Sequence, residues 1–272
     1  MQPARRPSAR TALYGALGCA AALVLVGVGA AWLAPVHAID ADAAGGFVAA
    51  APTELGAQTA RIAQLCDPRP YLLIGLGLVG VALLRGRFAR AGAVAVLLVV
   101  TGLTTQTLKS TLGHPRAGEI LGVDLGSWPS GHSTAAMTLA LCAVLVAPRA
   151  LRGAVAVAGA AFALAVGLGV LVMEWHYATD VAGGYLVAMT WMLLAVAALR
   201  RVERPGRVPA RAVTPVWGWI AVAAVTGAVA GRVHADSLAS FALDHTWAAL
   251  TATGLCVMAV VLAASLAATL RR

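Results

Sequence analysis

The sequence contains little charge. Only 11% of its 272 residues are Asp, Glu, Lys or Arg, whereas soluble globular chains carry about 25%. Hydrophobic residues make up 60% of the chain, and the mean hydropathy is +0.84. This composition excludes an ordinary soluble enzyme and a disordered chain. It predicts an integral membrane protein, since about eight spans of about 20 residues fit the apolar share.

Cysteines and aromatic residues are also scarce. The four cysteines stand at positions 19, 66, 142 and 256 without a CxxC pair, so they imply no zinc or disulfide framework. Three lie in apolar runs as small core hydrophobes, and we expect Cys66 to be exposed. The net charge of +9 could suit nucleic acid, but basic residues form short clusters without aromatic interleaving. We therefore expect no nucleic-acid partner.

The long apolar runs predict an all-α fold, a polytopic membrane helix bundle of about eight spans. We place the spans at 11–33, 70–84, 91–108, 133–148, 153–173, 178–198, 214–231 and 246–270. The run at 70–84 is short, but Pro68 and Pro70 suit the start of a helix. The first span resembles a signal peptide that ends near Val36-His37-Ala38, yet its apolar stretch is too long for one. We interpret residues 1–33 as a retained N-terminal membrane anchor.

The basic residues are distributed unevenly between the two ends of these spans. If the N-terminus is cytoplasmic, 15 of the 20 Lys and Arg residues lie on the cytoplasmic side. The positive-inside tendency therefore predicts that both termini are cytoplasmic, in a bacterial plasma membrane. All six histidines and ten of the eleven acidic residues then fall on the outer side, with Glu203 as the exception. Groups capable of chemistry are thus predicted at the extracytoplasmic face.

The segments between and after the spans complete the expected organisation. Residues 34–69 are predicted to form an extracytoplasmic loop, with a short helix around Pro52–Leu65 lying on the membrane surface. Residues 199–213 form a basic cytoplasmic linker, whose charge suits the anionic inner leaflet. Residues 214–272 form a C-terminal transmembrane pair, in which we expect Asp236, Asp244 and His245 to be packing and loop residues.

One polar cluster closes the span at 91–108. Lys109 and Arg116 are seven residues apart across a turn that contains Gly113 and Pro115. Lysine offers a point charge and arginine a planar fork, the usual combination for phosphate oxygens. A charged side chain near membrane depth is costly and tends to be functional. Snorkelling of Lys109 at the end of a helix remains the plain structural alternative.

Two further clusters meet on the same side, because the spans at 133–148 and 153–173 form a hairpin. Ser130 is predicted to be a helix N-cap, and Gly131 lets an anion approach the free N–H groups. His132 projects from the first turn. His176 and Asp180 are four residues apart on one helical face, so the carboxylate would orient the ring and leave its other nitrogen free. An ordinary cap and a polar pair between helix ends are the structural alternatives.

Taken together, the clusters supply two cations, a helix N-terminus and two histidines, an inventory that suits phosphoryl transfer. Their order resembles the signature of the PAP2 (type 2 phosphatidic acid phosphatase) superfamily of membrane lipid phosphatases, K-x6-RP, then PSGH, then SR-x5-H-x3-D. The matching positions are Lys109 to Arg116, Pro129-Ser130-Gly131-His132, and His176 to Asp180. The resemblance covers about residues 70–198 and implies a six-helix PAP2-like catalytic core there.

This resemblance also implies the role of each site residue. His176 would be the nucleophile, oriented by Asp180, and His132 would protonate the leaving oxygen and later activate water on a phosphohistidine intermediate. Phosphate would be held by Lys109, Arg116, the Ser130 hydroxyl and the Gly131 amide, without a metal ion or a cofactor. The implied partner is a lipid phosphate in the bilayer, such as undecaprenyl diphosphate or another polyprenyl diphosphate, phosphatidic acid, phosphatidylglycerol phosphate or a lipid-linked sugar phosphate.

The chain departs from the family signature at two places. Ala117 replaces a proline, and Gly169-Val170 stands where the family has Ser-Arg. The second change removes one phosphate-binding cation, and His114 is a candidate substitute.

Three alternatives to the phosphatase stay open. The missing arginine favours a catalytically silent or transporting protein. A serine hydrolase could use Ser130, His176 and Asp180, although no strained nucleophile turn is visible. A metal site could be built from His132, His176, Asp180 and Asp124.

Overall fold

The structure is a computed structural model that describes residues 9–112, 127–203 and 235–270. Several positions and segments singled out above lie outside these ranges. They are Gly113, His114, Pro115, Arg116, Ala117, Asp124, residues 204–213 of the expected linker and the span expected at 214–231.

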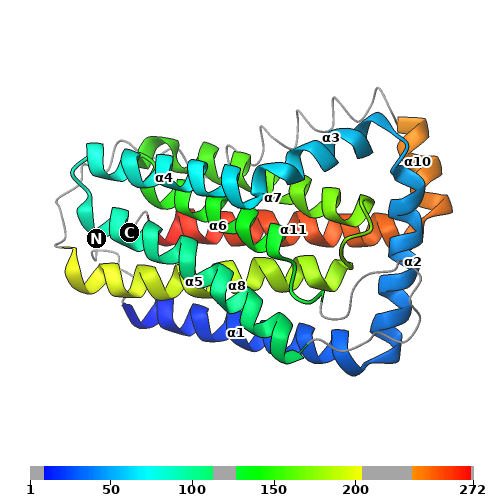
Figure 1. The fold of residues 1–272 in the computed structure, drawn as a ribbon, viewed down its shortest axis with the longest axis horizontal. Coiled ribbons are helices and arrows are strands. Elements are labelled where there is room, and N and C mark those ends of the chain that lie inside the picture. The colour runs from blue at the N-terminus through cyan, green and yellow to red at the C-terminus, as the bar shows by residue number, and fades with distance from the viewer. Residues whose placement is uncertain (1–8, 113–126, 204–234, 271–272) are drawn as a thin grey trace, which may run out of the picture.

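Every regular element of the described residues is helical. The helices are α1 (Ala9–Trp32), α2 (Ala34–Ala50), α3 (Glu54–Ala63), η1 (Gln64–Cys66), α4 (Pro68–Leu84), α5 (Phe88–Leu112), α6 (Gly131–Val146), η2 (Arg149–Leu151), α7 (Arg152–Val172), α8 (Ala178–Val202), α10 (Ala235–Asp244) and α11 (Thr246–Thr269). The long helices run along a common axis (Figure 1). Helices α1, α5, α8 and α11, and the segment Arg149–Val172, are each long and apolar enough to cross a membrane.

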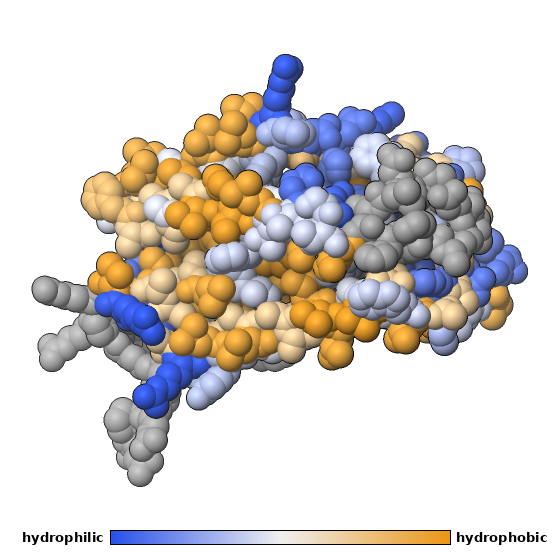
Figure 2. All heavy atoms as spheres, turned by 60° about the horizontal axis from the view of Figure 1, so that its bottom comes forward, coloured by the Kyte–Doolittle hydropathy of each residue, from blue (hydrophilic) through white to orange (hydrophobic). Residues whose placement is uncertain are grey.

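Large apolar side chains cover the outside of this bundle. Leu25 of α1, Leu73 of α4 and Phe88 of α5 are each at least 70% exposed, and Figure 2 shows apolar side chains over much of one face. Soluble monomers rarely expose apolar surface on this scale, whereas hydrocarbon chains solvate it. The prediction of an all-α membrane helix bundle is confirmed.

Helix α6 lies at the centre of the bundle, with most of its side chains buried. It packs against α5, α7 and α8. Small residues allow the close approach, since a Cβ at Gly159 of α7 would lie 2.9 Å from the Cβ of Ala140. Packing through small residues is typical of helices in a bilayer, where apolar side chains gain little by leaving lipid.

The terminal helices belong to the same body. Within the described part of residues 70–198 the bundle has α4 to α8, and α1, expected as a separate anchor, packs along α8. Helix α11 packs against α7, α2, α6 and α8. The segment before it contains α10, a helix that the apolar pattern does not predict. In the described residues, the N-terminal and C-terminal helices therefore pack directly on the helices of residues 70–198.

The segment at 34–69 differs from the expected loop. Helix α2 lies across one end of the bundle (Figure 1), and α3 packs along α7. A helix near Pro52–Leu65 is thus present. Its expected place on the membrane surface stays a prediction, but it packs directly against α7. This close packing requires glycine at position 169, because any Cβ there would collide with the carbonyl oxygen of Thr59. The absence of a side chain lets α3 approach α7.

A bend of 66° joins the α3–η1 segment to α4, and together they have the length and composition of a broken span or a re-entrant loop. Cys66 lies at this bend and is only 6% exposed, so the expectation of an exposed thiol is wrong. Pro68 and Pro70 begin α4 as expected, because a proline in the first turn gives up no intrahelical hydrogen bond.

The bundle has two chemically different ends. The first residues of α1 and the last of α11 lie at one end, with the α4–α5 turn, η2 and the end of α8 (Figure 1). The opposite end carries α2, α10, the last turn of α5 and the starts of α6 and α8. The histidines and most acidic residues of the described ranges belong to this second end, as the sequence predicts.

Candidate active site

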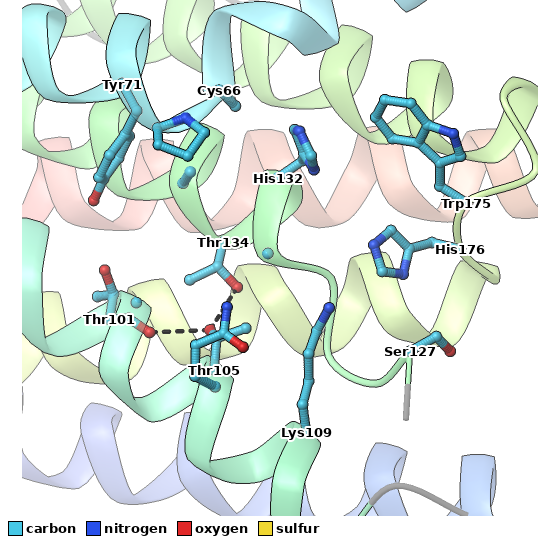
Figure 3. Close-up of a pocket in the computed structure, with 15 residues that line it drawn as sticks. Cys66, Tyr71, Thr101, Thr105, Lys109, Ser127, His132, Thr134, Trp175 and His176 are labelled. Carbon is cyan, nitrogen blue, oxygen red and sulfur yellow. Dashed lines mark hydrogen bonds between the residues drawn. The ribbon is translucent and has the colours of Figure 1, made fainter. Parts of the chain in front are cut away.

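A cavity of about 650 Å³ opens among α4, α5, α6 and the turn between α7 and α8. It holds three of the polar residues singled out in the sequence, and Figure 3 shows Lys109, His132 and His176 around one space. The lining residues are Cys66, Pro68, Tyr71, Thr101, Gly102, Thr105, Gln106, Lys109, Ser127, Gly131, His132, Thr134, Ala135, Trp175 and His176.

The turn that carries His176 is set by the way α7 ends. Glu174 adopts the left-handed conformation, with φ 58°. The N–H of Glu174 donates to the carbonyl of Leu171 at 3.1 Å, and that of Trp175 donates to Val170 at 3.0 Å. These two bonds form a Schellman motif, in which glycine usually takes the left-handed position. The chain therefore leaves α7 sharply and directs His176 into the cavity.

Asp180 fixes the ring of His176. Its Oδ2 lies 3.3 Å from Nδ1 of His176 and accepts the N–H of Tyr177 at 3.0 Å. The carboxylate is completely buried and His176 is only 7% exposed. A carboxylate on Nδ1 holds the proton there, so the Nε2 atom keeps a free electron pair.

Asp40 of α2 supports the same turn from outside. Its Oδ2 accepts the hydroxyl of Thr179 at 2.6 Å, and its Oδ1 accepts the N–H of Thr179 at 3.3 Å. The carboxylate is buried and stands at the N-terminus of α8, where negative charge is favourable. Asp40 thus fastens α2 to the segment that carries His176 and Asp180.

The start of α6 forms a second wall of the cavity. Ser130 is the N-cap, and its Oγ accepts the N–H of Ser133 at 3.3 Å. The predicted cap is confirmed, although Ser130 is fully buried and lies behind the lining. Gly131 and His132, in the first turn of α6, do line the cavity. The N-terminus of the helix and its free N–H groups therefore face this space.

Two glycines of α8 hold this wall in place. A Cβ at Gly184 would lie 2.8 Å from the carbonyl oxygen of Ser130 and from the amide nitrogen of Thr134. A Cβ at Gly183 would lie 2.7 Å from Nε1 of Trp128. The N–H of Ser130 also donates to the carbonyl of Asp180 at 2.9 Å. Glycine is required here because the α6 backbone rests directly on α8.

His132 has two neighbours that come from other elements. Its Nε2 lies 3.0 Å from Oδ1 of Asp67, and its ring centroid lies 5.2 Å from that of Trp175 at an angle of 46°. Asp67 comes from the bend between η1 and α4, and Trp175 from the α7–α8 turn. Two elements far apart in the sequence therefore fix one imidazole.

Lys109 is in the last turn of α5. Its amine points toward the space between the two imidazoles (Figure 3). Further along α5, Thr105 donates its hydroxyl to Oγ1 of Thr134 at 3.2 Å, which ties α5 to α6 beside the cavity. Lys109 is half-buried and supplies a fixed cation to any anion held there.

Burial is the main influence on the nucleophile candidate, and it lowers the pKa of His176 below its ordinary 6.5. Asp180 opposes this shift, while the charges of Lys109 and His132 add to it. An imidazole with a lowered pKa is neutral over a wider pH range. At neutral pH the Nε2 electron pair is therefore available for attack or for binding.

The predicted site residues fall into three groups. The cavity is lined by Lys109, Gly131, His132 and His176. Ser130 and Asp180 lie behind the wall, where each holds a neighbour. Arg116 lies outside the described residues, as do His114 and Asp124. The buried cap position of Ser130 disfavours the serine hydrolase.

Sequence reasoning misses Asp40, Asp67 and Trp175 as parts of the site. Asp40 and Trp175 carry no local signal, because their partners come from distant segments. Asp67 does carry one. It precedes Pro68-Arg69-Pro70, and Pro70 has no N–H at the third helical position, where an N-cap carboxylate would otherwise bind.

The departure at Gly169-Val170 has a structural cause. Gly169 gives room to the α3 backbone, and Val170 is completely buried in the apolar core. A serine and an arginine at these positions would meet α3 and a close-packed interior. In this chain, α3 packs against α7 at the position where the family signature has a serine.

The sequence model described as the PAP2 superfamily matches residues 90–204. A comparison with curated proteins gives no match. Among solved structures, the fold is similar to the crystal structure of a transmembrane PAP2-type phosphatidylglycerolphosphate phosphatase from Bacillus subtilis, with a TM-score of 0.55 and 20% sequence identity. The similarity covers 70% of this chain and 98% of that chain. At this identity the likeness establishes a shared fold.

Proposed function

We propose that this chain is a membrane phosphatase of the PAP2 superfamily that acts on a lipid-borne phosphate or diphosphate, and the match of the PAP2 model to residues 90–204 supports this proposal. The observation that carries the proposal is the convergence of Lys109, His132 and His176 on one cavity. Phosphoryl transfer depends mainly on positioning and on stabilising charge, and these three groups offer a cation and two imidazoles for it.

In the proposed reaction, Nε2 of His176 attacks phosphorus and the bond to the leaving oxygen breaks. His132 protonates that oxygen, and the product is a phosphohistidine. Water then attacks the phosphorus, with His132 taking its proton, and the P–N bond returns its electron pair to His176. Lys109, the Gly131 amide and Arg116 are assigned to the phosphate oxygens, whereas the buried Ser130 hydroxyl, expected from the sequence to join them, caps α6 behind the wall.

The shape of the cavity supports an amphiphilic substrate. From Lys109 its lining continues along α5 to Thr101, eight residues earlier, which is about 12 Å at the rise of an α-helix. Tyr71 and Gly102 line this inner part. A phosphate at the histidines would leave room for the first part of an attached chain among the helices. Free phosphate would leave most of the 650 Å³ unused.

The proposal includes the side of the membrane. Six arginines of the described ranges, Arg85, Arg87, Arg149, Arg152, Arg200 and Arg201, lie at the end of the bundle opposite to the cavity. Because basic residues favour the cytoplasmic side, the cavity is assigned to the extracytoplasmic face and both termini to the cytoplasm.

The test is phosphate release in detergent from phosphatidic acid, phosphatidylglycerol phosphate and undecaprenyl diphosphate. We expect His176→Ala to abolish release and His132→Ala to lower it by about 10²–10⁴-fold. His37→Ala is the matched control, since His37 binds the carbonyl of Ala30 and should keep full activity. Release should persist in EDTA. Turnover retained by His176→Ala would reject the assignment.

A catalytically silent protein is the second candidate, favoured by one observation. Val170 is buried in the core, so the arginine expected there has no counterpart at that position. If the purified wild-type protein releases no phosphate from any lipid of the panel, this alternative replaces the phosphatase.

A further inference from the structure

Asp67 is the one carboxylate of the described residues that contacts His132. It occupies the N-cap position of α4, yet its side chain makes no cap hydrogen bond. The reason is local, because proline at the third helical position removes one of the two N–H groups that an N-cap side chain normally accepts. The carboxylate turns instead to Nε2 of His132, 3.0 Å away.

This contact determines which nitrogen of His132 is available. A carboxylate on Nε2 holds a proton on that atom, so Nδ1 is the nitrogen that can give or take another. Trp175 packs against the same ring and limits its rotation. The arrangement parallels the pair of His176 and Asp180, but the bonded nitrogens are opposite, since Asp180 binds Nδ1 of its histidine.

We propose that Asp67 is a positioning residue for proton transfer, which orients His132 so that its Nδ1 serves the leaving oxygen. The inference rests on the proposed function. When Nε2 of His176 forms the P–N bond, the P–O bond breaks and its electron pair stays on oxygen. That oxygen takes the proton from Nδ1 of His132, while the Nε2 proton remains on the bond to Asp67. Attack by water later returns a proton to Nδ1.

Proton transfer to the leaving group matters most when that group is strongly basic. The test therefore compares two amphiphilic substrates in detergent micelles, dodecyl phosphate, which releases an alkoxide, and 4-dodecyl-2-nitrophenyl phosphate, which releases a stable phenolate. The measured quantity is kcat/KM, which includes the steps through release of the alcohol or phenol.

For Asp67→Ala we expect kcat/KM to fall by about 10–100-fold on the alkyl phosphate and by less than about threefold on the nitrophenyl phosphate. Asp67→Glu should recover part of the loss. The matched control is Glu54→Ala, which removes an acid from the same segment that binds Gln58 rather than a histidine. It should change neither rate. The unfolding temperature of every variant is measured in the same detergent.

The outcomes separate the two proposals. A selective loss on the alkyl phosphate supports the role of Asp67. Equal losses on both substrates, or no loss on either, overturn that role and leave the phosphatase intact. Failure of the wild-type protein to hydrolyse either substrate overturns both proposals.

Discussion

His176 and His132 owe their chemistry to different carboxylates. Asp180, in the first turn of α8 and four residues after His176 of the α7–α8 turn, is buried and binds Nδ1. Asp67, from another part of the chain, binds Nε2 of His132 and is half-exposed. The first pair is close in sequence and is predicted there, although His176 lies in the turn before α8 and not on the expected shared helical face. The second needs the bend before α4, which only the tertiary structure reveals.

The charge of Asp180 leads to a prediction about pH. Neutral His176 is the attacking form, so activity should fall as pH drops through its pKa, which lies below 6.5. Asp180 raises that pKa, and Asp180→Asn removes this contribution. We expect the acidic limb of kcat/KM against pH to move to lower pH, while kcat falls by about 10²–10⁴-fold because the ring loses its orientation. A limb that moves to higher pH would contradict this assignment.

The pH profiles of the variant and the wild-type protein are measured on the same substrate, so the titration of the substrate affects both profiles equally. Asp42→Asn is a suitable control, because this acid is exposed on α2. Its pH profile should match that of the wild-type protein.

At the scale of elements, the site depends on close contacts between helix ends. The first turn of α6 rests on Gly183 and Gly184 of α8, and the C-terminal turn of α7 directs Trp175 and His176 toward it. Asp40 ties α2 to the start of α8. Small residues and caps therefore determine the distance between the two imidazoles, although none of them needs to touch the substrate.

Gly184→Ala tests this dependence. Its Cβ would press on the backbone of Ser130 and Thr134 and push the start of α6 away from α8. Overpacking of this kind costs about 1–3 kcal/mol, and a displacement of about 1 Å at the site can cost about 10²-fold in rate. We expect a lower unfolding temperature and a lower kcat/KM for a lipid phosphate.

The control for that variant is Gly92→Ala in α5, where a Cβ meets nothing within 4 Å. This substitution should leave the rate unchanged and the stability equal or slightly higher, since alanine favours a helix. If Gly184→Ala behaved like Gly92→Ala, the contact between α6 and α8 would not control the site.

At the scale of the whole molecule, arginines at the end opposite the cavity hold helix termini together. Arg85 donates to the carbonyl of Val146 at 2.7 Å, Arg152 to Leu270 at 2.7 Å, and Arg200 to Thr269 at 2.8 Å. These bonds satisfy carbonyls at the C-termini of α6 and α11, where positive charge is favourable. These arginines, which predict the membrane topology from the sequence, thus also stabilise the contacts between helix ends.

Glu203, the one acid expected on the cytoplasmic side, belongs to this network. Both of its oxygens accept hydrogen bonds of 2.8 Å from Arg90, and these bonds lower its pKa below the ordinary 4.5. Because the carboxyl pKa is lower in the folded state than in the unfolded state, the ion pair stabilises the fold at pH values above the unfolded-state pKa. This stabilisation is lost as pH falls through the folded-state pKa. The pair joins α5 to the end of α8.

Glu203→Gln should therefore lower stability by about 1–2 kcal/mol at neutral pH, a value reduced for partial exposure of the carboxylate. The difference from wild type should shrink as pH falls below 4.5. Thermal unfolding in detergent across this range measures both effects. A difference that stays constant with pH would show that the ion pair does not stabilise the fold.

The sequence by itself determined the composition of a membrane protein, the positions of the apolar helices in the described ranges, the cap at Ser130 and the pair of His176 and Asp180. These features are local, because they depend on apolar length, helical period and neighbouring residues. Only the tertiary structure decided that α1 packs along α8, that α3 lies against α7 at Gly169, and that Asp40 and Asp67 reach the site. Those features join segments that are far apart in the chain, and no local sequence pattern predicts which distant segments will be in contact.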